Sequence, residues 1–252
     1  MWRLSEQLYE RRQCVQYDET EWDFVCRLLA DEGIASWHES DGERTQWLLG
    51  DAPASHDRIA GGVFGFDDGS GLGRTTLAFF RFERTFAQVP TASHVREYDV
   101  RQPSVLIEGR AGEGSLEQYE YPGWVLEGDA AERRAKVRLE QHQRDADHAI
   151  GATRSVKLAP GRVVQLAAMP DDFLDGEYLV TEVRHALDQR DTNRSKPYVA
   201  ECRLVPHGER SYRPVAPLSQ PRVDGIESAL VTGPSGEEIH VDDLGRIKLK
   251  TH

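Results

Sequence analysis

The sequence has few cysteines: Cys14, Cys26 and Cys202 are the three in 252 residues. Their number is odd and no two follow the CxxC spacing, which argues against a disulfide framework and against a cysteine-based zinc site. We therefore expect reduced, buried thiols, as is typical of a protein that folds in the cytosol.

Long hydrophobic runs are also absent. No apolar stretch approaches the roughly 20 residues that a membrane-spanning helix needs. Residues 1–13 are polar and lack the apolar segment of a secretion signal. We expect no stable membrane insertion, and export would need a route that does not read an N-terminal signal.

The chain has no excess of basic charge. It contains 31 Lys and Arg against 43 Asp and Glu, a formal net charge of -12. Nucleic-acid binding relies on concentrated Lys and Arg, whereas the bases here are interspersed with acids. We expect no nucleic-acid partner.

Motifs of catalysis and metal binding are incomplete. An HExxH zinc motif begins at His38 and Glu39, but Gly42 stands where the second histidine is required. A GxSxG motif begins in residues 233–237 but ends in Glu instead of Gly. The nine histidines show no ligand spacing.

Neighbouring acids such as Glu117 and Glu120 could in principle serve as general acid and base. In a chain with 43 acidic residues, such pairs arise by chance. We therefore predict no catalytic, cofactor-binding or metal-binding residues, and no cofactor.

Residues 18–33 give the clearest helix prediction. Asp18 or Thr20 can cap its start, and Gly33 stands where a left-handed residue ends a helix. The expected core-facing stripe comprises Trp22, Val25, Cys26 and Leu29.

A second helix is predicted over residues 129–149. Asp129 is its expected cap and Gly151 follows its end. The apolar stripe is narrow and consists of small residues: Ala131, Ala135, Leu139, Ala146 and Ile150. We interpret this helix as a mostly solvated one, or one that lies against a partner.

Period-two alternation predicts that the rest of the chain is mainly β. Asp41-Gly42 is a strong signal for a hairpin turn. The expected strands cover residues 34–39, 43–49, 76–86, 93–100, 176–187 and 196–206. Residues 191–193 join the last two strands. Their expected buried face comprises Val180, Val183, Tyr198, Ala200, Cys202 and Leu204.

The closing residues 230–252 contain two alternating patterns around a turn at Asp242–Gly245. Because an isolated hairpin is marginally stable in water, this segment is interpreted as the beginning of a further domain.

Four motifs, taken in order, resemble the VgrG spike proteins of type VI secretion systems and related phage baseplate hubs. They are Tyr9–Glu39, "YEYPG" at Tyr119–Gly123, the strands "LAPGRVVQL" and "DGEYLVTEVRHAL", and "ALVTGPSGEEIHVDDLGRIKLKTH" at the C-terminus. The resemblance covers nearly the whole chain.

This resemblance implies a mainly β fold with α+β inserts: an Hcp-like, phage-hub-like β-barrel with two helices, followed by the first hairpin of an OB-fold. Residues 1–90 would form an α/β insert and residues 91–213 the barrel region. Residues 214–229 would be a Pro-rich linker, and residues 230–252 the start of the OB-fold stalk.

The resemblance further implies a non-enzymatic protein that forms a homotrimer in its full-length context. Such a spike docks on the Hcp tube and carries a PAAR tip protein and effectors or their adaptors. It would be cytoplasmic before firing and then enter the target cell. Compared with the family, the chain is expected to be truncated at both ends.

Three alternatives stay open. One is a phage tail baseplate hub protein. Another is a glycan or peptidoglycan hydrolase that uses Glu117 and Glu120. The third is a binding module for a chaperone or effector, using Arg133 and Arg134 of the helix at 129–149.

Overall fold

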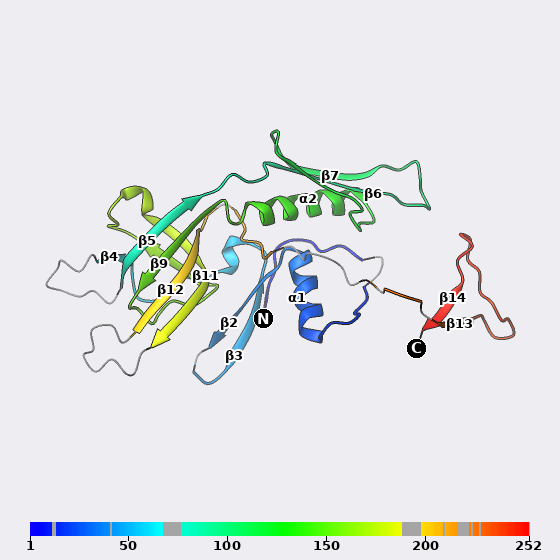
Figure 1. Cartoon of the computed structure of the whole chain (residues 1–252), viewed down its shortest axis with the longest axis horizontal. Helices are drawn as coiled ribbons and strands as arrows, with labels where there is room; N and C mark the ends of the chain where they lie inside the picture. Colours follow the sequence, from blue (N-terminus) through cyan, green and yellow to red (C-terminus); the bar gives the residue numbers. More distant parts are fainter. Residues whose placement is uncertain are drawn as a thin grey trace.

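The computed structural model describes residues 1–11, 14–40, 42–67, 77–187, 198–208, 210–215, 222, 224–226 and 228–251. Strands dominate, and two α-helices accompany them in this part of the chain (Figure 1). No helix among the described residues is long and apolar enough to cross a membrane. The mainly β fold class is confirmed.

The largest sheet has six strands in the order β10-β11-β12-β9-β5-β4. Their bounds are β4 Gly65–Phe66, β5 Ala78–Phe86, β9 Asp147–Thr153, β10 Val163–Leu166, β11 Gly176–Leu187 and β12 Tyr198–Pro206. Neighbours pair antiparallel except β4 and β5, which are parallel. The sheet curls into a half-barrel (Figure 1).

The main hydrophobic core lies inside this curl. Four residues of the predicted face are buried: Val180, Ala200, Cys202 and Leu204. Val183 packs against the same core while half-buried, and Tyr198 is half-buried too. The predicted turn at residues 191–193 lies outside the described residues.

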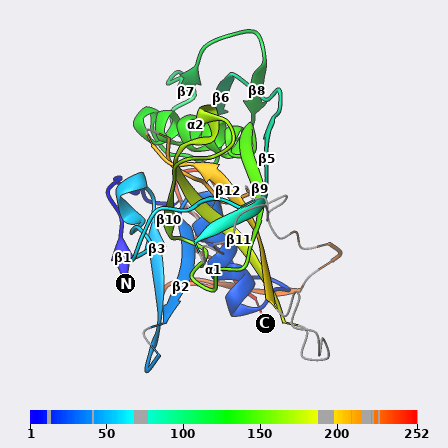
Figure 2. The same ribbon diagram turned by 90° about the vertical axis from the view of Figure 1, so that its left-hand side faces the viewer.

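A second sheet has the order β7-β6-β8, with β6 Ala92–Glu97, β7 Ile107–Gly112 and β8 Glu117–Glu120. Helix α2 (Gly128–Gln143) packs across it and lies between this sheet and the rest of the molecule (Figure 2). The approach is close at Gly109, where a Cβ atom would meet the Ala131 carbonyl carbon at 2.1 Å.

The predicted hairpin around Gly42 is confirmed. Strands β2 (Ala35–Ser40) and β3 (Thr45–Gly50) pair antiparallel, and β1 (Trp2–Arg3) adds to β3 in parallel. Gly42 has a φ of 94°, which suits a glycine in a tight turn.

Helix α1 (Glu21–Asp31) confirms the first predicted helix, but the predicted core stripe was wrong at Trp22. The Thr20 side chain accepts a hydrogen bond from the Asp23 amide, as a cap should, and Gly33 has a φ of 72°. Trp22, however, is 53% exposed. The helix contacts β2, its apolar stripe is half-buried, and the Trp22 ring packs at the surface against Trp47 in a tilted arrangement.

The second helix was predicted too long, and its environment was predicted wrongly. It ends at Gln143, because residues 147–153 form β9 at the centre of the six-stranded sheet. Its N-cap is Glu127 rather than Asp129. The helix is also not a solvated one. Its buried residues are Ala130, Ala131, Ala135, Val137, Arg138, Leu139 and Gln141.

All three cysteines are free thiols, but the expectation that all are buried was wrong. Cys202 is buried in the half-barrel core, Cys26 is half-buried, and Cys14 is exposed. Burial raises the pKa of the Cys202 thiol to about 12, which keeps it protonated and unreactive.

The closing segment forms a small separate unit (Figure 1). Strand β13 (Ala229–Thr232) pairs with β14 (Lys248–Thr251), and Val241 bridges to Ile247. The predicted turn at Asp242–Gly245 is present, since the Gly245 amide donates to the Asp242 carbonyl.

The domain boundaries stay a prediction. The half-barrel draws β4 and β5 from one side of residue 90 and β9 to β12 from the other. The predicted linker at 214–229 falls partly outside the described residues. The assignment of residues 230–252 to an OB-fold also stays a prediction.

Candidate functional site

A cluster of buried charges joins α1, α2 and β8. Asp31, at the end of α1, accepts from two arginines of α2: Arg138 Nη2 lies 2.5 Å and Arg134 Nη2 3.1 Å from its Oδ1. Arg11, from the N-terminal segment, lies 2.7 Å from Oδ2. One carboxylate therefore meets three guanidinium groups from two parts of the chain.

Glu120 of β8 closes the cluster from the opposite side. Its Oε1 lies 2.8 Å from Arg134 Nη2, and its Oε2 lies 2.7 Å from Arg138 Nε. Gln141 accepts from Arg138 at 2.8 Å and donates to the Ala30 carbonyl at 2.6 Å. Arg134 and Arg138 of α2 are thus held from both ends of the junction.

The charges in this cluster stabilise one another. Burial by itself raises the pKa of Asp31, but the three arginines around it outweigh burial and hold that pKa well below its usual value. Burial lowers the pKa of Arg138, and Glu120 together with Asp31 more than reverses that effect. Asp31 and Arg138 are therefore both charged across the ordinary pH range.

Arg213 makes a second, fully buried junction. Its side chain is 0% exposed, with Nε at 2.6 Å from Glu140 Oε2 and Nη2 at 2.8 Å from Glu6 Oε1. Its Nη1 donates to the Gly33 carbonyl at 3.1 Å. The segment after β12 is thereby fastened to α2, to the N-terminal segment and to the end of α1.

These clusters correct the interpretation of Arg133 and Arg134 as solvated binding residues. Arg133 Nη1 lies 2.7 Å from Glu32 Oε2, and Arg134 pairs with Asp31 and Glu120. Both side chains are engaged inside the protein, so they are not available to a partner.

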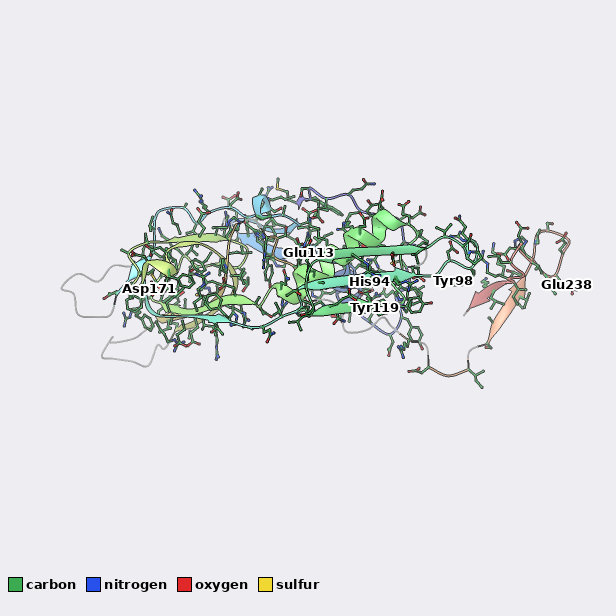
Figure 3. The ribbon with its side chains drawn as sticks, turned by 90° about the horizontal axis from the view of Figure 1, so that it is seen from above. His94, Tyr98, Glu113, Tyr119, Asp171 and Glu238 are labelled. Atoms are coloured by element: carbon green, nitrogen blue, oxygen red, sulfur yellow. The ribbon has the colours of Figure 1, made fainter. Side chains whose placement is uncertain are left out.

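Glu117 and Glu120 have separate ionic partners. Glu120 pairs with two arginines of α2. The Glu117 carboxylate instead lies 3.4 Å from Arg110 and 4.0 Å from His94. His94 and Tyr119 lie together on the three-stranded sheet, with ring centroids 5.3 Å apart (Figure 3).

The incomplete zinc motif also has a structural use. Glu39 accepts from the Trp37 indole at 3.0 Å and pairs with Arg162 at 2.9 Å. The His38 ring packs beside both Trp22 and Trp47, with centroids 6.4 Å from each. Among the described residues, no group of three or more His, Cys, Asp or Glu side chains could hold a metal ion.

Sequence patterns did not single out Glu6, Asp31, Arg138 or Arg213. The spacing of Arg134 and Arg138 could have suggested a shared helix face, because residues four apart lie together on a helix. Arg213 precedes a Pro-rich stretch and gives no local sign of burial. Its partners are separated from it by up to 207 residues.

A family model describes residues 1–190 as a phage tail baseplate hub (GPD). The type VI secretion system spike protein VgrG4b of Pseudomonas aeruginosa is 29% identical over 99% of this chain and 33% of its own length. VgrG5 of the same organism is 30% identical over 95% of this chain and 33% of its length. The chain thus spans about a third of these curated relatives.

Solved structures share the fold. The E. coli c3393 protein, described as a type VI secretion component similar to T4 tail proteins gp27 and gp5, matches all of this chain and 54% of its own. Its TM-score is 0.63 at 19% identity. The 43 kDa tail protein of prophage MuSo2 from Shewanella oneidensis matches 81% of this chain and 61% of its own, with a TM-score of 0.54 at 14% identity.

The family match to residues 1–190 includes three of the four motifs that carry the resemblance. The VgrG relatives extend the similarity to nearly the whole chain. This chain belongs to the phage tail baseplate hub (GPD) family, and its relatives include the VgrG spike proteins of type VI secretion systems.

Proposed function

We infer that the chain is the hub part of a type VI secretion spike and acts as a structural component rather than as an enzyme. The observation that carries this proposal is the set of VgrG relatives that match 95% or more of the chain. The buried clusters support the proposal, because they hold separate segments together and their carboxylates are ion-paired with arginines.

In this role, three copies would assemble into a hub that docks on the Hcp tube. The stalk and needle of the full-length protein would follow the closing hairpin, with a PAAR tip protein and effectors or adaptors beyond. The protein would be cytoplasmic before firing and then enter the target cell.

A phage tail baseplate hub protein is the second candidate. It is favoured by the family description and by the prophage tail protein of similar fold. The two candidates differ in the tube on which the hub would dock. A hydrolase has no comparable support, because Glu117 and Glu120 are both ion-paired.

The test is a chimera in which this chain replaces the matching third of P. aeruginosa VgrG4b. Native mass spectrometry should give three chains per complex, and Hcp rings should co-purify with it. Unmodified VgrG4b serves as the positive control. A monomeric chimera that captures no tube protein would overturn the proposal, and capture of a phage tail tube protein instead of Hcp would support the second candidate.

A further inference from the structure

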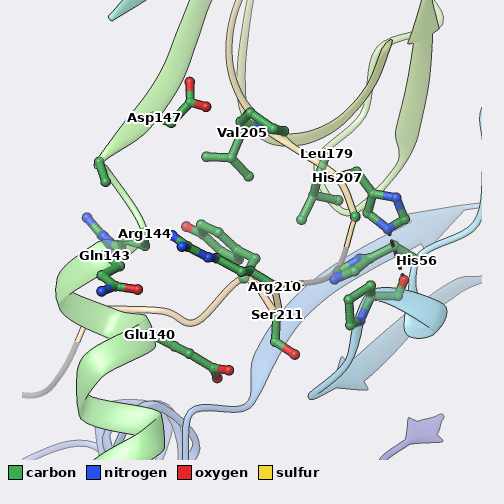
Figure 4. Close-up of a pocket in the computed structure, with 15 residues that line it drawn as sticks. His56, Glu140, Gln143, Arg144, Asp147, Leu179, Val205, His207, Arg210 and Ser211 are labelled. Carbon is green, nitrogen blue, oxygen red and sulfur yellow. Dashed lines mark hydrogen bonds between the residues drawn. The ribbon is translucent and has the colours of Figure 1, made fainter. Parts of the chain in front are cut away.

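A cavity of about 440 Å³ lies between the end of α2, the six-stranded sheet and the segment that follows β12 (Figure 4). Its lining includes Arg144, Leu179, Val205, Arg210 and Tyr212. The volume falls within the range that small-molecule sites occupy. The proposed structural role makes no use of this cavity.

The strap over the cavity, defined as residues 206–208 and 210–213, is fastened at both ends. At its start, the His207 amide donates to the Glu177 carbonyl at 2.8 Å, and His207 Nε2 donates to the Pro53 carbonyl at 3.1 Å. At its end stands the buried Arg213. A cavity roofed by a strap with two fixed ends keeps its shape, which favours ligand binding over collapse.

The two arginines that line the cavity are less completely paired with opposite charges than its two acids are. Arg144 contacts Asp145 through Nε at 3.0 Å, and Asp145 also pairs with Arg203 at 2.8 Å. Arg210 makes no hydrogen bond or ion pair with any residue that the structure describes.

Among the described residues that line the cavity, both acids are engaged elsewhere. Asp147 accepts from Arg84 through both oxygens, at 2.8 and 2.7 Å. Glu140 accepts from Arg213 at 2.6 Å. The charge that remains among the described lining residues is therefore positive, within a chain whose formal net charge is -12.

The other walls suit an apolar body. Leu179 and Val205 are buried side chains of β11 and β12, and Tyr212 adds an aromatic ring from the strap. His56 lies on the side away from Arg144 (Figure 4), with Nδ1 donating to the Gly161 carbonyl at 3.0 Å. Cationic and apolar walls together match a ligand with an anionic head and a small apolar body.

We propose that this cavity binds a small organic anion, whose carboxylate or phosphate is held by Arg144 and Arg210 and whose apolar body packs among Leu179, Val205 and Tyr212. The site is independent of the spike assignment, because its geometry lies within one chain.

The test is isothermal titration calorimetry of the whole chain at low salt with benzoate, phenyl phosphate, inorganic phosphate and benzamide. Benzoate or phenyl phosphate should bind, and the neutral benzamide should not. Loss of a charge-assisted hydrogen bond in Arg210→Gln should weaken binding about tenfold or more. Because Arg210 has no partner in the described chain, its replacement should leave the melting temperature of the unliganded protein unchanged.

Arg144→Gln should weaken the same ligands, and Arg184→Gln is the matched control because Arg184 is an exposed arginine of β11 that does not line the cavity. The proposal fails if neither organic anion binds at millimolar concentration, or if all three variants bind as the wild type does. Binding of inorganic phosphate as tight as that of phenyl phosphate would refute the role of the apolar walls.

Discussion

Among single residues, Asp31 is a buried acid at the centre of the charge cluster. It is 7% exposed at its side chain and lies within 3.1 Å of three arginines. Its removal would leave Arg138, itself 9% exposed, with Glu120 as its remaining ionic partner. Removing one partner of a buried pair is costly because the other charge stays desolvated.

We therefore expect Asp31→Asn to lower the free energy of unfolding by about 3–5 kcal/mol. The control is Asp57→Asn, since Asp57 pairs with Arg3 but is 53% exposed, and exposed pairs contribute less than about 1 kcal/mol. Urea denaturation of both variants at neutral pH measures the difference. Equal losses would show that the burial of Asp31 does not matter.

The same residue predicts a dependence of stability on acid. The pKa of Asp31 is lower in the folded protein than the value of about 3.9 for an unfolded chain. Its contribution is thus fully present above the unfolded pKa and is lost as pH falls through the folded pKa. The gap in unfolding free energy between wild type and Asp31→Asn should be constant from pH 5 to 8 and shrink below about pH 4. A gap that grows on acidification would contradict this assignment.

Between elements, the contact of α2 with the three-stranded sheet depends on Gly109. An added Cβ would lie 2.2 Å from the Glu132 amide nitrogen as well as 2.1 Å from the Ala131 carbonyl carbon, and backbone atoms cannot turn aside as side chains can. Gly109→Ala should destabilise the protein by about 1–3 kcal/mol or more. Gly128→Ala is the control, because nothing lies within 4 Å of its added methyl. Thermal melting distinguishes the two, and an unchanged midpoint for Gly109→Ala would mean that helix and sheet are less closely packed.

The attachment of the strap after β12 depends on the three contacts of Arg213. Arg213→Met fills a similar volume but leaves Glu140 and Glu6 without this cation, so we expect a loss of about 3–5 kcal/mol. Arg213→Lys keeps the charge but cannot reach all three partners, so it should fall between Met and wild type. Limited proteolysis should cut near residues 206–215 sooner in the Met variant. Identical cleavage patterns in all three proteins would show that Arg213 does not hold the strap.

Elements with local signals could be predicted from the sequence, and those defined by distant partners could not. The hairpin at Gly42, the Thr20 cap and the alternating face of β11 and β12 each depend on neighbouring residues. Trp22 has the right spacing for a core residue, yet it is 53% exposed and packs at the surface against Trp47. The second helix carries mostly small and charged side chains, and these are buried because the sheet and α1 supply matching charges that the helix sequence does not reveal.

On the scale of the whole molecule, the prediction of a non-catalytic architecture depends on which partners the acidic side chains have in the fold. Forty-three acidic residues offer many chance pairs, and only the fold assigns Glu120 and Glu140 to arginines from other segments. The anion cavity beneath the strap had no sequence signal, because its arginines come from the end of α2 and from the segment after β12. Family resemblance indicated the architecture, and three-dimensional contacts were needed for both junctions.

The closing hairpin leads to the last prediction, because its apolar residues face solvent. Their exposed fractions are Leu230 66%, Val231 38%, Ile239 53%, Val241 56%, Ile247 48% and Leu249 51%. Strands β13 and β14 form a two-stranded sheet with each other, and such a sheet presents open edges to other chains. We expect the chain to self-associate at micromolar concentration through this hairpin.

Sedimentation velocity over a range of concentrations measures that association. Deletion of residues 229–252 should abolish it while leaving the melting temperature of the remainder unchanged, since the half-barrel and the α2 junction keep their own contacts. The triple change Val231→Ser, Ile239→Ser, Leu249→Ser keeps the full length and should reduce association in the same direction. If the intact chain is a monomer throughout, or if the deleted chain associates equally, the hairpin is not the adhesive surface and the exposed edges of the larger sheets become the ones to test.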